Sequence, residues 1–168
     1  MSIRCGRKTK ITRRNSMLAD LSQGDIVYTL IEGEDENSAS ASRELIVHQA
    51  IYLGTAHDAV VHAHPAHATA LSLTMNKIVP IDSEGHYSLG TVPVLSVDDS
   101  IGSREVADRI PEILAENPMV MVAGHGSFAA GKDLEEAFRY TSCLEMSSKI
   151  IWLNSVLNSC GGVGCDTV

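Results

Sequence analysis

The alternation of apolar and polar positions predicts strands and helices that follow one another along the chain. Short runs rich in β-branched and other apolar residues, bounded by glycine, proline or polar turns, are typical of strands. Apolar residues three and four positions apart are typical of helices. We therefore expect strands within 24–33, 58–64, 77–81, 87–97 and 118–131, and helices over 42–58, 65–75, 103–117 and from Asp133 onward. This interleaving predicts an α/β fold with a mixed, mainly antiparallel sheet covered by helices.

Several element boundaries and one packing face can also be predicted from residue types. Ser42 or Ser40 is the expected N-cap of the first helix, and 82–85 is the expected turn between two strands. Pro111 is expected to end or kink the helix that contains it. The last helix has an expected packing face that consists of Leu134, Ala137, Phe138, Thr141, Leu144 and Ser148.

The composition restricts the class of protein. A length of 168 residues is enough for one domain with a sizeable core, and no repeat or linker divides the chain. No apolar run approaches the roughly 20 residues of a membrane span, and no signal-peptide segment follows the basic N-terminus. The formal net charge of −8 argues against a nucleic-acid partner. We therefore expect a cytoplasmic protein that acts without a membrane or nucleic acid.

The positive charge is concentrated near the N-terminus. Six of the 13 basic residues lie there with no acid among them, namely Arg4, Arg7, Lys8, Lys10, Arg13 and Arg14. One interpretation is a charged, solvated pair of strands. The other is that one or two of these residues, such as Arg14, face an anionic substrate.

The stretch AVVHAHPAHATALS places three histidines directly after an apolar strand. His62 and His64 are two residues apart, so on a strand both imidazoles point to one face and can reach one point in space. Neutral imidazole is a common zinc ligand, and a catalytic zinc has three protein ligands and one open position. Pro65 turns the chain before His67, whereas His125 lies between two glycines at the end of another strand. We favour His125 as the third ligand, and an incidental pair of histidines is the alternative.

A carboxylate is the next requirement for catalysis, and Glu44 is a candidate at the start of a predicted helix. His48 follows four residues later on the same face. The alternatives are that Glu44 only satisfies the helix dipole and that His48 is a partly buried histidine with a local hydrogen bond. Spacing alone does not connect Glu44 to the other histidines.

Three segments of the chain together resemble the class II aldolase/adducin family. They are SRELIVHQAIY, AVVHAHPAHATALS and AGHGSFAAGKDLEEAFRYTSCLE, and the resemblance runs from Ser2 to about Leu157. It is nearest to fuculose-1-phosphate aldolase-like enzymes. It implies a three-layer α/β/α sandwich, with 1–168 as a single domain that lacks the family's N-terminal helix. It also implies a homotetramer with active sites between subunits.

The resemblance implies that His62, His64 and His125 hold zinc, or another divalent metal such as cobalt or manganese. It implies that Glu44 is the catalytic acid and base. The implied reaction cleaves a ketose 1-phosphate, similar to L-fuculose 1-phosphate, into dihydroxyacetone phosphate and an aldehyde. The metal would act as a Lewis acid while Glu44 moves a proton. The family's second acid is a tyrosine from a neighbouring subunit, and Tyr87 lies in roughly the matching region. A structural tyrosine at a strand edge is the other interpretation of Tyr87.

The family's phosphate-binding segments match only in part. MSIR matches the end of the first segment, ITRRN replaces ITPTG, and SR replaces a pair of serines before the acid. The residues at matching positions are Ser2, Arg14, Asn15, Ser42 and Arg43. One interpretation is that Arg14 and Arg43 bind phosphate through charge-assisted hydrogen bonds. The other is that Met1 is an internal methionine and that the phosphate pocket needs a preceding segment.

Other functions remain open for the same residues. A dehydratase of the family, similar to methylthioribulose-1-phosphate dehydratase, would use the same metal and acid for loss of water. A non-catalytic adducin-like interaction domain would need no metal cluster. An epimerase is disfavoured because the related pentulose-phosphate epimerases typically have aspartate at the position of Glu44.

Overall fold

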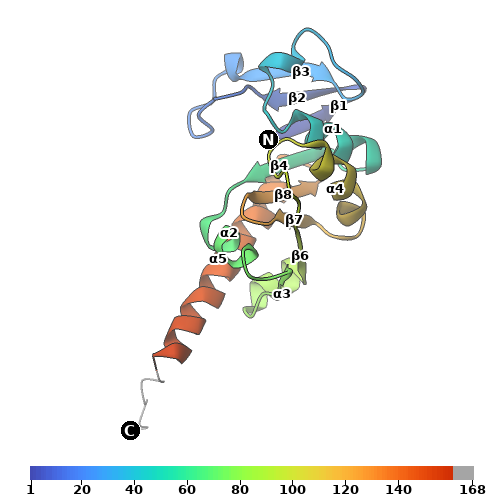
Figure 1. The fold of residues 1–168 in the computed structure, drawn as a ribbon. Helices are drawn as coiled ribbons and strands as arrows, with labels where there is room; N and C mark the ends of the chain where they lie inside the picture. Colours follow the sequence, from blue (N-terminus) through green and yellow to red (C-terminus); the bar gives the residue numbers. More distant parts are fainter. Residues whose placement is uncertain (161–168) are drawn as a thin grey trace.

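A mixed sheet of eight strands forms the centre of the protein in a computed structural model, which describes residues 1–160 (Figure 1). The last eight residues of the predicted domain lie outside the described residues. The strands are β1 (Ser2–Cys5), β2 (Lys8–Thr12), β3 (Ile26–Leu30), β4 (Ala59–Ala63), β5 (Lys77–Ile78), β6 (Val92–Leu95), β7 (Met119–Val122) and β8 (Gly126–Gly131). Their order is β3-β2-β1-β4-β8-β7-β6-β5. Only β6 and β7 pair in parallel within 1–160, so the predicted mixed, mainly antiparallel sheet is confirmed.

Helices cover both faces of this sheet and make three layers. The helices are α1 (Leu45–Gly54), α2 (Ala66–Ser72), α3 (Ser83–Leu89), α4 (Arg104–Glu116) and α5 (Leu134–Ser159), with short 3-10 turns η1 (Gln23–Asp25) and η2 (Ser38–Ser40). Helices α1 and α4 pack together on one face, and α2, α3 and α5 pack together on the other. The α/β/α sandwich is therefore confirmed.

The central strands are apolar throughout because they face both layers of helices. In β7, Val120 and Val122 enter the core under α1 and α4, whereas Met119 and Met121 enter the core under α2, α3 and α5. All four side chains are fully buried. Successive residues of a strand point to opposite faces, so a continuous apolar run is the pattern that a sheet covered on both sides requires.

Two predicted boundaries are wrong. The first helix is capped by Glu44 instead of Ser42 or Ser40. The segment expected to be a turn and then strand is helix α3, because the Asp82 carboxylate accepts a hydrogen bond from the Gly85 N–H at 2.8 Å and caps a helical turn. The strand expected over 87–97 is correspondingly confined to β6.

Pro111 does not end helix α4, which continues to Glu116. The buried face of α4, which includes Ile110 and Leu114, holds the helix against the sheet in spite of the missing backbone donor. The proline ring packs against α1 at Gly54, where an added Cβ would lie 2.6 Å from the Pro111 Cβ. Glycine at this position therefore permits the close approach of α1 and α4.

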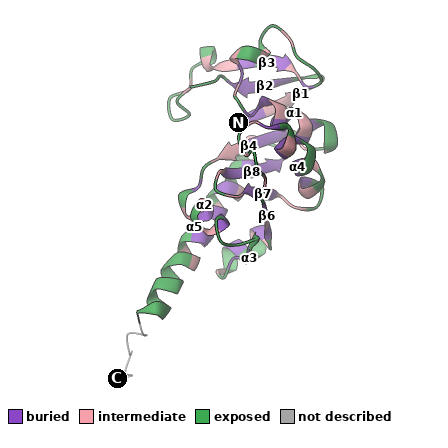
Figure 2. Ribbon diagram, in the orientation of Figure 1, coloured by how far each residue is buried: buried purple, intermediate pink, exposed green. Residues whose placement is uncertain are grey.

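Helix α5 begins at its predicted cap, Asp133, but its predicted packing face is partly wrong. Phe138 is 58% exposed, whereas Ala137, Thr141 and Leu144 are buried. The second half of α5 projects from the body and is largely exposed (Figures 1 and 2). The exposed apolar residues there are Trp152, Leu153, Val156 and Leu157. No helix described within 1–160 is both long and apolar enough to cross a membrane.

Candidate metal centre and active site

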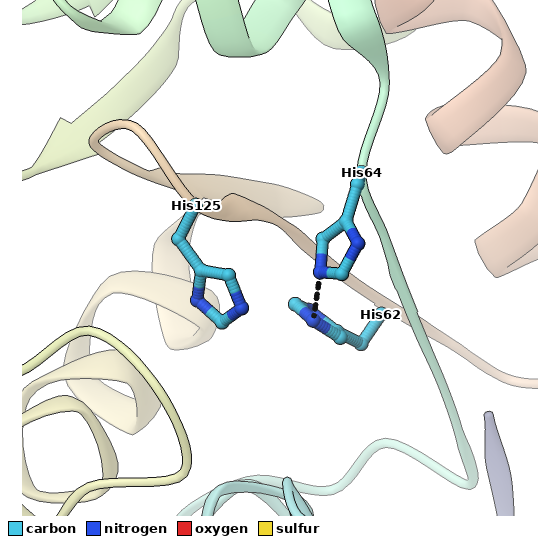
Figure 3. A group of neighbouring side chains, drawn as sticks. All are labelled: His62, His64 and His125. Atoms are coloured by element: carbon cyan, nitrogen blue, oxygen red, sulfur yellow. Dashed lines mark hydrogen bonds between the residues drawn. The ribbon is translucent and has the colours of Figure 1, made fainter. Parts of the chain in front are cut away.

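The pairing of two strands brings the predicted histidines together. His62 and His64 lie at the end of β4, and His125 lies in the turn between β7 and β8. Since β4 pairs antiparallel with β8, the end of one strand lies beside the start of the other. The three side chains converge (Figure 3), and their ligand nitrogens all lie within 4.8 Å of one another. Among residues 1–160, these three histidines form the cluster of side chains that could hold a metal ion.

The orientation of His62 suits a metal ligand. Its Nδ1–H donates to the carbonyl oxygen of Ser127 at 3.0 Å, which leaves the Nε2 lone pair facing His64. The two Nε2 atoms lie 3.0 Å apart, so without a metal the His64 Nε2–H donates to His62. Two nitrogens bound to one tetrahedral zinc at about 2.0–2.1 Å are about 3.4 Å apart. The spacing of His62 and His64 is therefore close to what one zinc ion requires, whereas the separation of up to 4.8 Å within the cluster would shorten when an ion binds.

Electrostatics also favour the form of imidazole that binds metal. Burial, together with the neighbouring His125 and His64, lowers the pKa of His62 to about 3. Burial and His64 lower the pKa of His125 as well. Both rings are consequently neutral near pH 7, with a lone pair available to a metal.

The backbone beside the histidines has room for glycine only. A Cβ added at Gly126 would lie 2.5 Å from the carbonyl oxygen of Ala63 and 2.5 Å from the Cδ2 of His64. The start of β8 can therefore approach the end of β4 closely, as the position of His125 next to His64 requires.

Glu44 lies beside this cluster at the N-terminal end of α1. Its carboxylate is buried, accepts a hydrogen bond from the Gly102 N–H at 3.2 Å and lies 3.9 Å from the Nε2 of His125. Burial is the main cause that raises the pKa of Glu44. Gly102 has a φ of +55°, and a Cβ there would lie 2.4 Å from the carbonyl oxygen of Arg43, so glycine permits this contact. A proton-accepting group thus lies next to the potential metal site.

A cavity of about 510 Å³ opens onto the cluster. Among the residues that line it are the three histidines, Glu44, His48, and four of the predicted phosphate ligands, which are Arg14, Asn15, Ser42 and Arg43. Asn15 has a φ of 65°, which turns the chain at the cavity edge. A neighbouring cavity of about 890 Å³ shares Arg14, Ser42 and Arg43 with the first.

Three other predicted or considered residues lie elsewhere. Ser2 is buried, and its hydroxyl contacts His48 and Tyr52 instead of lining the cavity. Tyr87 is 89% exposed on α3 and does not line the cavity in this chain. His67 lies on α2, where its Nδ1 is 2.6 Å from the Oε1 of Glu145.

Sequence reasoning misses two features of the site. One interpretation of the sequence is a partly buried His48 with a local hydrogen bond, but the residue is fully buried and lines the cavity. Nothing in the sequence marks the loop that contains Gly102 as part of the site, although its backbone contacts Glu44. His48 could have been found from its position four residues after Glu44, which places both side chains on one helix face. The contact between Gly102 and Glu44 could not, because it joins segments that are distant in the sequence.

The free energy of unfolding of the metal-free protein is expected to fall as the pH drops from about 6.5 towards 3. Burial lowers the pKa of His48 and of His62, so in this range the unfolded chain binds protons that the folded chain does not. Each such proton changes the free energy by roughly 1.4 kcal/mol per pH unit. The raised pKa of Glu44 acts in the opposite direction, but it is outnumbered by His48, His62 and also His125, whose pKa burial lowers as well.

Denaturant unfolding of chelator-treated protein at several pH values measures this dependence. The variant His48→Gln removes one of these histidines and should reduce the slope, whereas the exposed control His86→Ala should leave it unchanged. A free energy of unfolding that stays constant from pH 7 to 4 would show that these rings are protonated in the folded state.

Comparison with known proteins identifies the family of this chain. Residues 1–152 match the family model described as class II aldolase and adducin N-terminal domain. The L-fuculose phosphate aldolase of Methanococcus maripaludis strain C7 is 28% identical over 160 residues, which are 95% of this chain and 85% of that protein. The 3-oxo-tetronate 4-phosphate decarboxylase of Escherichia coli K12 is 28% identical over 148 residues, which are 84% of this chain and 69% of that protein.

A solved structure supports the same assignment. The L-fuculose-1-phosphate aldolase from Thermus thermophilus has a TM-score of 0.91 with this chain at 32% sequence identity. The match covers 96% of this chain and 85% of that one. The family match, this structural likeness and the family resemblance of the three sequence segments all agree. The chain therefore belongs to the class II aldolase and adducin N-terminal domain family.

Proposed function

We propose that this protein is a metal-dependent aldolase that cleaves a ketose 1-phosphate of the L-fuculose 1-phosphate type. The products would be dihydroxyacetone phosphate and an aldehyde. The observation that carries the proposal is the position of a buried carboxylate, Glu44, 3.9 Å from one of three converging imidazoles. The relatives named as L-fuculose phosphate aldolases support this choice of substrate class.

The roles of the residues follow from their chemistry. His62, His64 and His125 would hold a zinc, cobalt or manganese ion. When bound, such an ion supplies Lewis-acid stabilisation of negative charge on substrate oxygens. When the carbon–carbon bond breaks, the hydroxyl group of the carbon that becomes the aldehyde would lose its proton to a base, for which Tyr87 of a neighbouring subunit is the candidate. Glu44 would deliver a proton to the carbon that is released. Burial raises the pKa of Glu44, which favours the protonated form that this delivery needs.

The phosphate group of the substrate would bind at the mouth of the cavity. Arg14 and Arg43 line it from two different segments, both are exposed, and neither guanidinium forms a hydrogen bond or ion pair within residues 1–160. Guanidinium donates paired hydrogen bonds to phosphate. Ser42 and Asn15 add polar groups at the same edge, and Ser2 would act indirectly because its hydroxyl is buried.

Replacement of Arg14 or Arg43 by glutamine is expected to raise the KM for the sugar phosphate about 10- to 100-fold. A hydrogen bond to a charged group contributes about 1.5–3 kcal/mol, and most of it is lost without the guanidinium. Steady-state kinetics should show a much smaller change in kcat, because the reacting carbon lies next to Glu44. The control Arg109→Gln changes an arginine that bonds to the Ser96 carbonyl and lines neither cavity. An unchanged KM in both arginine variants would place the phosphate elsewhere.

The complete active site would form in a homo-oligomer, which we propose to be a tetramer. The exposed apolar residues on the second half of α5 provide a surface for a second copy. Tyr87 is exposed on α3, so a neighbouring subunit could receive its phenol as the second acid. Light scattering of the purified protein tests the assembly state.

A decarboxylase is the second candidate function, because relatives of equal identity have that name. Loss of carbon dioxide next to a carbonyl also leaves a carbon that needs a proton, so Glu44 would have the same role.

Product analysis after incubation with L-fuculose 1-phosphate tests the proposed aldolase function. Dihydroxyacetone phosphate and an aldehyde in equal amounts support the aldolase. A dehydrated sugar phosphate as the product would indicate a dehydratase instead. In a parallel incubation, release of carbon dioxide from a keto-acid phosphate, with L-fuculose 1-phosphate left unchanged, would indicate a decarboxylase.

A further inference from the structure

A fourth imidazole, His48, lies at the cavity without any assigned role. Its side chain is fully buried in helix α1 and lines the same 510 Å³ cavity as the three converging histidines. The Nε2 atom has no hydrogen-bond partner among residues 1–160. Buried polar atoms in native structures are nearly always paired, so this atom is a candidate for contact with a bound molecule.

A chain of hydroxyl groups behind His48 favours one arrangement of the hydrogens on its two ring nitrogens. The Ser2 Oγ lies 2.7 Å from the Nδ1 of His48 and 2.6 Å from the Tyr52 hydroxyl oxygen. If Tyr52 donates to Ser2 and Ser2 donates to His48, each hydroxyl hydrogen has an acceptor. The Nδ1 of His48 then accepts, and the hydrogen of the neutral ring is on Nε2. The ring is neutral because burial lowers its pKa well below the usual value.

The ring of His48 is held in a fixed relation to the potential metal site. Phe128 stacks on His62 with ring centroids 4.2 Å apart, and its edge meets His48 with centroids 6.1 Å apart. Glu44 and His48 are neighbours on helix α1, one turn apart. The donor is therefore held by packing on one side and by the Ser2 hydroxyl on the other.

We propose that the Nε2–H of His48 donates a hydrogen bond to an oxygen of the bound sugar phosphate. His48 is then a substrate-binding residue, and Ser2 and Tyr52 are positioning residues that act through it. This inference rests on the proposed function, since it takes a sugar phosphate as the ligand of the cavity. The proposal also specifies the indirect role of the buried Ser2 hydroxyl, which would act by holding the His48 ring in place.

Two substitutions of His48 distinguish a role as a hydrogen-bond donor at Nε2 from a role in packing alone. The side-chain amide of His48→Asn lies near the former Nδ1 and keeps a partner for Ser2, but it does not reach the Nε2 position. The amide of His48→Gln reaches the Nε2 position and restores a donor. We expect His48→Asn to bind dihydroxyacetone phosphate about tenfold or more weakly, as loss of a hydrogen bond predicts. His48→Gln should remain within about threefold of the wild type, and both variants should keep the metal content of the wild type.

Calorimetric titration of the metal-loaded full chain with dihydroxyacetone phosphate measures these affinities. Wild-type affinity in His48→Asn, equal weakening in both variants, or loss of metal from His48→Asn would each overturn the proposed role. If the wild type itself does not bind dihydroxyacetone phosphate, the proposed function fails and the inference falls with it. Nitrogen NMR of the unsubstituted protein gives a test that does not depend on the variants. A hydrogen on the Nε2 of His48 supports the inference, and a hydrogen on Nδ1 overturns it.

Discussion

The double variant His62→Ala, His64→Ala is expected to contain no bound metal and to lose the proposed aldolase activity by about 1,000-fold or more. Both side chains come from one strand end, and together they supply two of the three converging nitrogens. Of the three histidines only His125 then remains, whereas a catalytic zinc typically has three protein ligands. Lewis-acid stabilisation is worth several kcal/mol, and each 1.36 kcal/mol of barrier changes the rate tenfold.

Metal analysis by mass spectrometry and a cleavage assay measure the two effects in parallel. The control His67→Ala removes a histidine three residues further along, which contacts Glu145 and is not part of the cluster. It should keep roughly one metal ion per chain. Full activity in the double variant would show that the three histidines do not hold a metal that is needed for the reaction.

The variant Glu44→Gln is expected to keep its metal and its fold but to lower kcat about 100- to 10,000-fold, the usual contribution of general acid–base catalysis. Glutamine has almost the same shape and can accept the hydrogen bond from Gly102. It cannot take up or release a proton at neutral pH. The loss should therefore appear in kcat, with little change in KM or in the temperature of unfolding.

The matched control for this variant is Glu112→Gln, which changes an exposed glutamate on α4. Its kcat should equal that of the wild type. A Glu44→Gln protein with normal kcat would mean that another group moves the proton. Loss of the metal from Glu44→Gln would instead assign the carboxylate to metal binding.

The histidine cluster could be predicted from sequence because its chemistry is local. His62 and His64 share one face of a strand by simple alternation, and the glycines beside His125 mark a tight turn at another strand end. The pairing of β4 with β8 is not visible in the sequence. It depends on contacts between residues more than sixty positions apart.

Other parts of the site could not be predicted because several local signals compete. Asp82 and Gly85 are as typical of a turn as of a helix start, and the packing of α3 against α5 favours the helix. Glu44 and Gly102 lie in segments that are far apart in the sequence, and no residue pattern in either segment indicates that they are in contact. His48 on helix α1 likewise lies against Phe128 of β8 and Ser2 of β1, which are distant from it in the sequence.

The most direct test of the metal centre is a crystal structure of the zinc-loaded protein, with anomalous scattering measured on both sides of the zinc absorption edge. The arrangement of the histidines predicts one strong peak about 2.0–2.1 Å from a nitrogen of each of His62, His64 and His125. The Glu44 carboxylate should lie beside this peak. A zinc peak bound by other residues, or no peak within reach of the three rings, would contradict a metal-dependent mechanism at this site.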